Sequence, residues 1–321
     1  MQLSNFSDCR RSYWTRLIGV SLVLLSVGCQ GVTTNAAALE SAKSASPNAL
    51  AVEAVPAEEE ALSAADVDVA ANNDDVLAAI ATHQVIYLGE THTSEADHQA
   101  QLEIIQALAE QQPEADKLVV GLEMFQRPFQ PVLDRYLAGE ISEADMIAQS
   151  EYETRWGYDW ELYAPIIRYA KDNQIPLVAL NTPAEVTRQV AREGLKSLSG
   201  DALTYIPPVE EIDTTDQAYR EAVSSVFSAH GGHGHSLDFE NFFAAQVLWD
   251  ETMAEAVVSQ LAADDTAQVV VLVGEGHIAY DYGIPNRVER RAPDVQQASV
   301  RLVPAAEEQA ADFADYFWLT E

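Results

Sequence analysis

Short apolar runs alternate with longer mixed stretches from residue 74 to the end of the chain, and most of these runs end at a polar residue. The strongest apolar runs have the length of buried strands and span residues 85–88, 117–122, 175–180 and 268–273. Residues 299–303 predict a further strand, and residues 315–319 predict an edge strand or a packed tail. Between these runs, the spacing of apolar residues predicts helices over 74–81, 95–109, 128–138, 143–149, 183–196 and 240–262, and the aromatic segment 156–169 is expected to run into a helix that ends at residues 172–173. This alternation predicts an α/β fold with a mostly parallel central sheet and helices on both faces.

The first apolar run leads directly into a polar turn. We expect Gly89 to end the strand, so that the turn over residues 90–93 carries Glu90 and His92. Ser94 is the expected N-cap of the helix that follows. Strand, polar turn and helix is an arrangement that places a ligand site above a parallel sheet.

Two regions lack clear periodicity. Residues 197–239 include Pro207 and Pro208, and we expect them to form an excursion between helices, either a lid or a small subdomain. The excursion contains a glycine-rich histidine tract over residues 230–235, of a kind that binds metal opportunistically. Residues 30–73 are rich in Ala, Ser and Glu and predict a flexible tether. Residues 74–321 are then expected to form a single α/β domain.

The first 29 residues have the pattern of a signal peptide. Basic residues precede an apolar run over residues 17–27, which is too short to span a bilayer comfortably. Gly28 and Cys29 at its end resemble a bacterial lipobox, although Ser26 stands where that motif usually has Leu. We therefore expect a lipid anchor at Cys29 and a location in the bacterial cell envelope, facing the periplasm or the outer surface. The other cysteine, Cys9, lies in the segment that would be removed, so no disulfide is expected.

Charge excludes one class of partner. The chain has 51 Asp plus Glu against 18 Lys plus Arg, which gives a formal charge of −33. A surface this acidic repels phosphate backbones, so we expect no binding to nucleic acid.

Polar side chains follow the four best strands. Glu90 with His92, then Glu123, Asn181 and His277 come at or just beyond strand ends, which lie along one edge of a parallel sheet. Two chemistries fit the set Glu90, His92, Glu123 and His277. The four residues could hold a divalent metal with an open position for water, as in a metal-dependent hydrolase, or act without metal as base and partner.

Other candidates flank these residues in the chain. Tyr163 and Tyr282 are among several tyrosines near the predicted site, and a phenolate is a known ligand of ferric haem iron. Arg287, Arg290 and Arg291 form a dense basic group that could receive the carboxylates of a ligand or pair with local acids. Gln246 and Asp250 lie one turn apart on the longest predicted helix and could reach the same cleft, although such pairs are usually solvated.

Six motifs, in order, resemble the ChaN-like haem-binding uptake lipoproteins: GETHTSEADHQ, GLEMFQRPFQPVLDRYLAGEIS, WGYDWELYAPII, VALNTP, FFAAQVLWDETMAEAV and GEGHIAYDYGIPNR. The resemblance covers residues 84–290. It implies an α/β domain that binds haem and takes part in haem or iron uptake. It also implies a homodimer that sandwiches two haems, as in dimeric members of the family.

The resemblance also implies roles for individual residues. A tyrosine would ligate the iron, with Tyr163 and Tyr282 as candidates, and His92, His277 and Arg287 are the candidates for holding propionates. The family is similar to a wider set of hydrolases, including erythromycin-esterase-like and TIKI-like proteins, through Gly89 to His92 and Gly274 to His277. Haem binding is therefore our leading hypothesis, and a metal-dependent hydrolase is the alternative.

Overall fold

The structure is a computed structural model that describes residues 72–112, 117–229, 238–305, 310 and 312–321. All of these residues belong to one compact unit, Ser46–Glu321. The predicted signal peptide, the lipid site at Cys29, nearly all of the predicted tether and the histidine tract over residues 230–235 lie outside the described residues.

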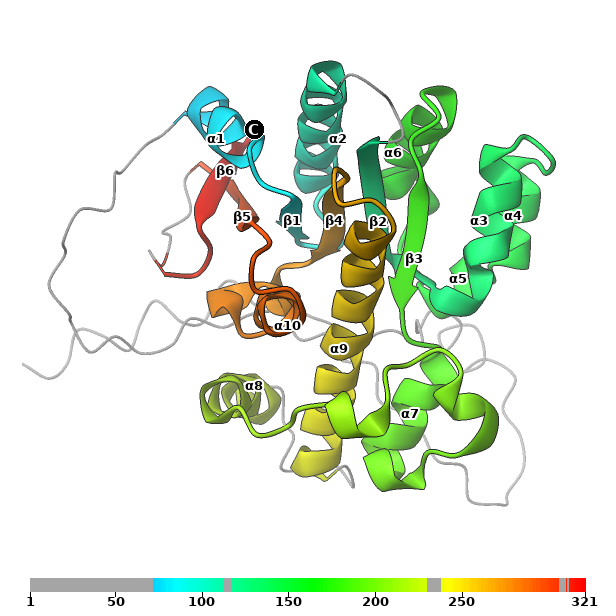
Figure 1. The fold of residues 1–321 in the computed structure, drawn as a ribbon, viewed down its shortest axis with the longest axis vertical. Coiled ribbons are helices and arrows are strands. Elements are labelled where there is room, and N and C mark those ends of the chain that lie inside the picture. Colours follow the sequence, from blue (N-terminus) through cyan, green and yellow to red (C-terminus); the bar gives the residue numbers. More distant parts are fainter. Residues whose placement is uncertain (1–71, 113–116, 230–237, 306–309, 311) are drawn as a thin grey trace, which may run out of the picture. The chain divides into compact units, whose positions relative to one another are not determined.

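A parallel sheet of six strands forms the centre of the described fold (Figure 1). Every neighbouring pair of strands is parallel, and the order across the sheet is β3-β2-β4-β1-β5-β6. The strands are β1 Val85–Glu90, β2 Leu118–Gln126, β3 Leu177–Asn181, β4 Gln268–Gly274, β5 Gln297–Pro304 and β6 Tyr316–Thr320. This sheet confirms the predicted α/β class, and β6 is an edge strand.

Helices cover both faces of the sheet. On one face, Val85 and Tyr87 pack with α9 Phe239–Ala263 and α10 Ile284–Arg291. On the other face, Ile86 and Leu88 pack with helices that include α2 Glu95–Gln111 and α6 Trp160–Asp172. Successive side chains of β1 therefore enter opposite cores, as expected for a strand buried on both sides.

The other elements are α-helices and single turns of 3₁₀ helix. The other α-helices are α1 Asn73–Ile80, α3 Gln130–Leu137, α4 Glu143–Gln149, α5 Tyr152–Arg155, α7 Ala184–Glu193 and α8 Gln217–Ala229. Single turns of 3₁₀ helix are η2 Arg127–Phe129, η3 Leu195–Ser197, η4 Gly200–Leu203, η5 Val209–Glu211, η7 Glu275–His277 and η8 Ala279–Asp281. None of the helices in the described ranges has the length and apolar character that crossing a membrane requires.

Helix caps explain two of the predicted helix starts. The Ser94 side chain accepts a hydrogen bond from the backbone N–H of Asp97 at 3.2 Å and so begins α2. Ser142 begins α4 with a capping box in which Ser142 and Asp145 bond reciprocally. The predicted bounds of α4 are confirmed.

The predicted ends of the first two strands are wrong. β1 continues through Gly89 to Glu90, which pairs with Gly274, and β2 continues past Glu123 to Gln126. Gly89 does not end the strand, because it lies between β4 and β5 in regular register. Its lack of a side chain instead leaves room for Ile278, which a Cβ atom there would overlap.

The described part of the excursion has its own apolar cluster. Residues from α8 and the 3₁₀ turns, such as Ile212 and Val223, pack with Val190 of α7 and Phe243 and Leu248 of α9. Figure 1 shows α7 and α8 on either side of the N-terminal part of α9, beyond the end of β3. This cluster lies near the edge of the sheet that carries the predicted site.

Candidate functional site

Glu90, at the end of β1, is the centre of the first group of contacts. It is 2% exposed, and it accepts hydrogen bonds from Tyr163 Oη at 2.6 Å and Gln101 Nε2 at 2.6 Å. His92 Nδ1 lies 2.9 Å from Glu90 Oε1. Because a carboxylate only accepts, His92 carries its proton on Nδ1 and leaves Nε2 on the opposite side of the ring.

Charge in this group is concentrated on Glu90. Burial alone would raise the pKa of Glu90, but the nearby His98 and His92 and the hydrogen bonds that it accepts outweigh burial and lower this pKa to about 2. The carboxylate is therefore ionised at neutral pH. Burial would lower the pKa of His92, and the bond to Glu90 together with the charge of Glu123 raises it above its usual value.

Glu123 lies at the centre of the second group. Its Oε2 accepts a hydrogen bond from the backbone N–H of Gly274 at 2.8 Å, and its Oε1 lies 3.5 Å from His277 Nε2. Burial opposes the ionised form of Glu123, but the charge of His277 is sufficient to hold its pKa below the usual range. Asn181 supports the backbone here by donating to the carbonyl of Glu123 at 3.0 Å.

His277 is held from its other side by α9. Its Nδ1 lies 2.6 Å from Asp250 Oδ1, and Tyr219 of α8 donates to Asp250 Oδ2 at 2.7 Å. Burial lowers the pKa of His277, but Glu123 and Asp250 outweigh burial and raise it to about 10. His277 is therefore protonated at neutral pH.

Tyr219 and Gln101 are site residues that the sequence did not mark, whereas Asp250 was expected to be able to reach this cleft and does so. An acidic residue inside the buried stretch of α9 is one signal for Asp250, since buried carboxylates are rare unless they are paired. No sequence pattern marks Tyr219. It reaches the site only because α8 packs against α9.

The two groups meet above Gly274. A Cβ atom on Gly274 would lie 2.9 Å from His92 Nε2 and 3.7 Å from Glu123 Oε2. The structure thus brings together Glu90, His92, Glu123 and His277, as the sequence predicts. The Nε2 atom of His277 lies on the Glu123 side of its ring.

The site is enclosed by aromatic side chains. The rings of Trp156 and Tyr158 lie 4.8 Å and 4.9 Å from the His92 ring, and Trp249 lies 6.1 Å from His277. The four central side chains belong to residues that are 1–4% exposed. A group as large as haem does not fit among them in this closed arrangement.

Among the residues that the structure describes, two buried polar atoms at the site have no hydrogen-bond partner. They are His277 Nε2 and Gln246 Oε1, and the Gln246 amide nitrogen lies 3.3 Å from His277 Nδ1. Nearly all buried polar groups in folded proteins are hydrogen-bonded. A buried polar atom without a partner therefore calls for an explanation, and a functional role is one.

The structure does not support a metal centre at these residues. No group of three or more His, Cys, Asp or Glu side chains in the described residues is placed to hold a metal ion. The reason is visible in the contacts, because Glu90 is occupied by three donors and His277 Nδ1 is directed at Asp250.

The predicted haem ligands lie in different environments. Tyr163 is 1% exposed, and its hydroxyl is committed to Glu90. Tyr282 is half-buried, with its ring centroid 5.7 Å from that of Tyr280 and 6.2 Å from that of Tyr219. Arg287 is 1% exposed, donates to the carbonyls of Tyr282 and Gly283, and lies 3.5 Å from Glu251. Of the two tyrosines, only Tyr282 is accessible to a large ligand.

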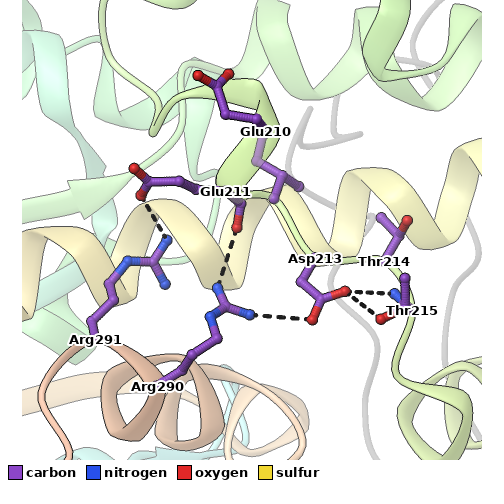
Figure 2. A pocket seen from close by; sticks show the side chains of 8 residues that line it. Glu210, Glu211, Asp213, Thr214, Thr215, Arg290 and Arg291 are labelled. Carbon is purple, nitrogen blue, oxygen red and sulfur yellow. Dashed lines mark hydrogen bonds and ion pairs between the residues drawn. The ribbon is translucent and has the colours of Figure 1, made fainter.

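The basic group on α10 pairs with local acids. Arg290 and Arg291 both contact the fully buried carboxylate of Glu251, at 2.7 Å and 2.6 Å. Both arginines also line an open pocket of about 550 Å³, where Figure 2 shows them directed at Asp213 and Glu211. These pairs tie the loop before α8 to α10 and leave few donors for a ligand in the pocket.

Comparison with known proteins gives a family. A model of the family described as haem-binding uptake, Tiki superfamily, ChaN matches residues 76–288. A chloroplast protein of Arabidopsis thaliana, RETICULATA-RELATED 5, is 28% identical over 250 residues, which are 73% of this chain and 34% of that protein. The chain therefore spans about a third of the length of this relative.

Solved structures agree on the fold. A structure of ChaN of Campylobacter jejuni with cofacially bound haem has a TM-score of 0.61 at 17% identity, over 77% of this chain and 91% of that one. An erythromycin esterase mutant in its open conformation has a TM-score of 0.43 at 13% identity, over 71% and 72% of the two chains. The likeness to ChaN shows a shared fold, and the likeness to the esterase is too distant to bear on the site.

Proposed function

Because this chain belongs to the family described as haem-binding uptake, Tiki superfamily, ChaN, we propose that it binds haem and serves haem or iron uptake. The match over residues 76–288 is the observation that carries this proposal, since it spans the whole site and most of the sheet. The shared fold with ChaN from Campylobacter jejuni, which binds haem cofacially, supports it.

Tyr282 is the proposed axial ligand. It fits this role because its phenol is half-buried among aromatic rings, and a phenolate supplies a strong ligand for ferric iron. Burial and the charge of Asp216 raise the pKa of Tyr282, so the phenol keeps its proton until a cation displaces it. Tyr163, His92, His277 and Arg287 do not fit a haem contact unless the helices around them move, because all four are buried and engaged.

A haem titration tests this assignment. Haemin is added to the full chain, and the Soret band is followed for wild type, Tyr282→Phe and Tyr163→Phe, with Tyr205→Phe as a control at an exposed tyrosine. We expect Tyr282→Phe to weaken binding by about tenfold or more, a loss of at least 1.4 kcal/mol, and the other two variants to bind as wild type does. Equal binding by Tyr282→Phe would exclude this tyrosine, and no Soret change in wild type would refute haem binding.

We also propose that a lipid at Cys29 anchors the protein in the cell envelope, facing the periplasm or the outer surface, and that two copies form a homodimer around haem. The signal-like pattern of residues 1–29 supports the anchor. Incorporation of a labelled fatty acid by wild type but not by Cys29→Ser tests the anchor.

Light scattering with and without haemin tests the dimer. A homodimer around haem predicts a doubled mass when haem is bound.

A second candidate function is hydrolysis at the buried centre without a bound metal. The observation that favours it is the His277 Nε2 atom, buried without a hydrogen-bond partner and facing Glu123. In this chemistry the neutral form of His92, protonated on Nδ1, accepts a proton from water at Nε2 while the water oxygen bonds to the carbonyl carbon of an ester. His277 then donates its Nε2 proton to the leaving oxygen as the carbon–oxygen bond breaks.

Gly274→Ala tests this second function without removing any reactive group. The added methyl would lie 2.8 Å from His92 Cε1, so it fills the point where His92 and Glu123 meet. With p-nitrophenyl acetate as probe, we expect wild-type hydrolysis to fall by about 10²-fold or more in Gly274→Ala and in His92→Gln. Hydrolysis that persists in both folded variants would place the activity elsewhere.

A further inference from the structure

A second carboxylate with a tyrosine lies behind His277 and repeats the arrangement behind His92. On the first side, Tyr163 donates to Glu90 at 2.6 Å, and Glu90 lies 2.9 Å from His92 Nδ1. On the second side, Tyr219 donates to Asp250 at 2.7 Å, and Asp250 lies 2.6 Å from His277 Nδ1. In both arrangements the contacts run from a tyrosine hydroxyl to a carboxylate and then to an imidazole.

These two series of contacts approach Glu123 from different parts of the fold. The first comes from β1 and α6, and the second comes from α8, α9 and the turn after β4. His277 Nε2 lies 3.5 Å from Glu123 Oε1, and a Cβ atom on Gly274 would lie 2.9 Å from His92 Nε2 and 3.7 Å from Glu123 Oε2. Each histidine is therefore oriented by one carboxylate on its Nδ1 side, and His277 faces Glu123 with its Nε2 atom.

We propose that Asp250, held by Tyr219, is a positioning residue that keeps the proton on His277 Nδ1 and directs Nε2 at Glu123, as Glu90 held by Tyr163 keeps the proton on His92 Nδ1. This role deepens the proposed hydrolytic function and rests on it for its chemical consequence. Asp250 itself is 0% exposed and acts through His277.

The distances show which neighbouring group fixes the proton on His277 Nδ1. A separation of 2.6 Å between an imidazole nitrogen and a carboxylate oxygen requires a proton between the two atoms. The Gln246 amide at 3.3 Å is a weaker partner of the same nitrogen. A second donor cannot point at a nitrogen that already carries a proton, so the bond to Asp250 takes precedence.

Tyr219 keeps Asp250 in its acceptor role. Its hydroxyl occupies Oδ2, which leaves Oδ1 for His277 and prevents the carboxylate from rotating freely. Burial raises the pKa of Tyr219 well above its usual range, so this phenol remains a donor. The Arg287 guanidinium, 5.0 Å above the Tyr219 ring, packs this tyrosine in place.

Nuclear magnetic resonance of the full chain with ¹⁵N-labelled histidine tests the positioning role directly. In wild type we expect a strongly downfield, slowly exchanging Hδ1 proton on His277, which His277→Gln identifies by removing it. Asp250→Asn should abolish this resonance, and Tyr219→Phe should shift it upfield. The controls Asp134→Asn and Tyr205→Phe change exposed residues of the same types and should leave it unchanged.

The same variants in the p-nitrophenyl acetate assay distinguish a failure of the positioning role from a failure of the hydrolytic function. We expect kcat to fall by about 10²- to 10⁴-fold in Asp250→Asn with KM little changed, as for loss of an imidazole-orienting carboxylate. An unchanged His277 resonance in Asp250→Asn overturns the positioning role, even where hydrolysis is present. Absent hydrolysis in wild type overturns the hydrolytic function, while the resonance still tests the positioning. If Asp250→Asn does not fold, an unshifted resonance in Tyr219→Phe overturns the proposal.

Discussion

At the scale of single residues, the most consequential feature is a buried carboxylate that is fully supplied with donors. Glu90 stays ionised although it is buried, because His92, His98, Tyr163 and Gln101 surround it. The same contacts that orient His92 should therefore contribute to stability in a pH-dependent way.

Replacing Glu90 with Gln should reveal that dependence. The pKa of Glu90 falls from the ordinary value of 4.5 to about 2 on folding, so its contribution is complete above pH 4.5 and is lost as the pH falls towards 2. At neutral pH we expect Glu90→Gln to cost on the order of 3 kcal/mol in the free energy of unfolding, an upper estimate for a coupled buried group. Urea unfolding between about pH 6 and pH 3 measures how the difference from wild type shrinks.

Glu103→Gln is the matched control, because Glu103 is an exposed glutamate on α2. It should leave the stability difference close to zero over the same pH range. A Glu90→Gln difference that stays constant with pH would show that packing, rather than charge, makes the contribution.

At the scale of elements, strand existence was more predictable than strand ends. The strands β1 to β4 were expected because each is a continuous apolar run, which is typical of a strand buried on both faces. The ends of β1 and β2 were misplaced at Gly89 and Glu123, because pairing with β4 and β3, respectively, carries these strands beyond the apolar residues. The hydrogen bonds between strands depend on the neighbouring strands, and the local sequence pattern does not specify which strands these are.

The edge strand β6 makes a contact that the local sequence does not predict. The Asn73 side chain donates to the carbonyl of Leu319 at 2.8 Å and accepts from its N–H at 3.0 Å. An amide side chain therefore occupies the place of a neighbouring strand at the open edge of the sheet, which otherwise favours pairing with another chain.

Asn73→Ala should destabilise this edge. Loss of both bonds is expected to lower the free energy of unfolding by about 1–2 kcal/mol, because the freed backbone groups are then bonded only to water. Urea unfolding gives the free energy, and light scattering reports any association through the edge. Asn173→Ala is the control, since that exposed side chain bonds only within its own helix end, and an equal loss there would contradict a special role for Asn73.

At the scale of the whole molecule, charge is the dominant property. A formal charge of −33 means that folding gathers many carboxylates into a smaller volume than they occupy in the unfolded chain. Their mutual repulsion opposes folding, and dissolved salt screens it.

Thermal unfolding should therefore shift upward with salt. Between about 10 mM and about 150 mM NaCl the screening length falls from about 30 Å to about 8 Å, which removes most long-range repulsion between exposed groups. We expect a higher midpoint at the higher concentration, measured by circular dichroism. KCl at the same ionic strength should give the same increase, and a rise with only one of the two salts would indicate specific ion binding instead.

The sequence by itself determined the α/β class, the central strands and the gathering of Glu90, His92, Glu123 and His277 at one edge of the sheet. These features follow from hydrophobic periodicity and from the rule that parallel strands share a carboxyl edge. The tertiary structure decided the rest. It buried Tyr163 against Glu90, left Tyr282 accessible, and brought Tyr219 and Asp250 behind His277. Those outcomes depend on how α6, α8 and α9 pack on the sheet, and such long-range packing has no local signal in the chain.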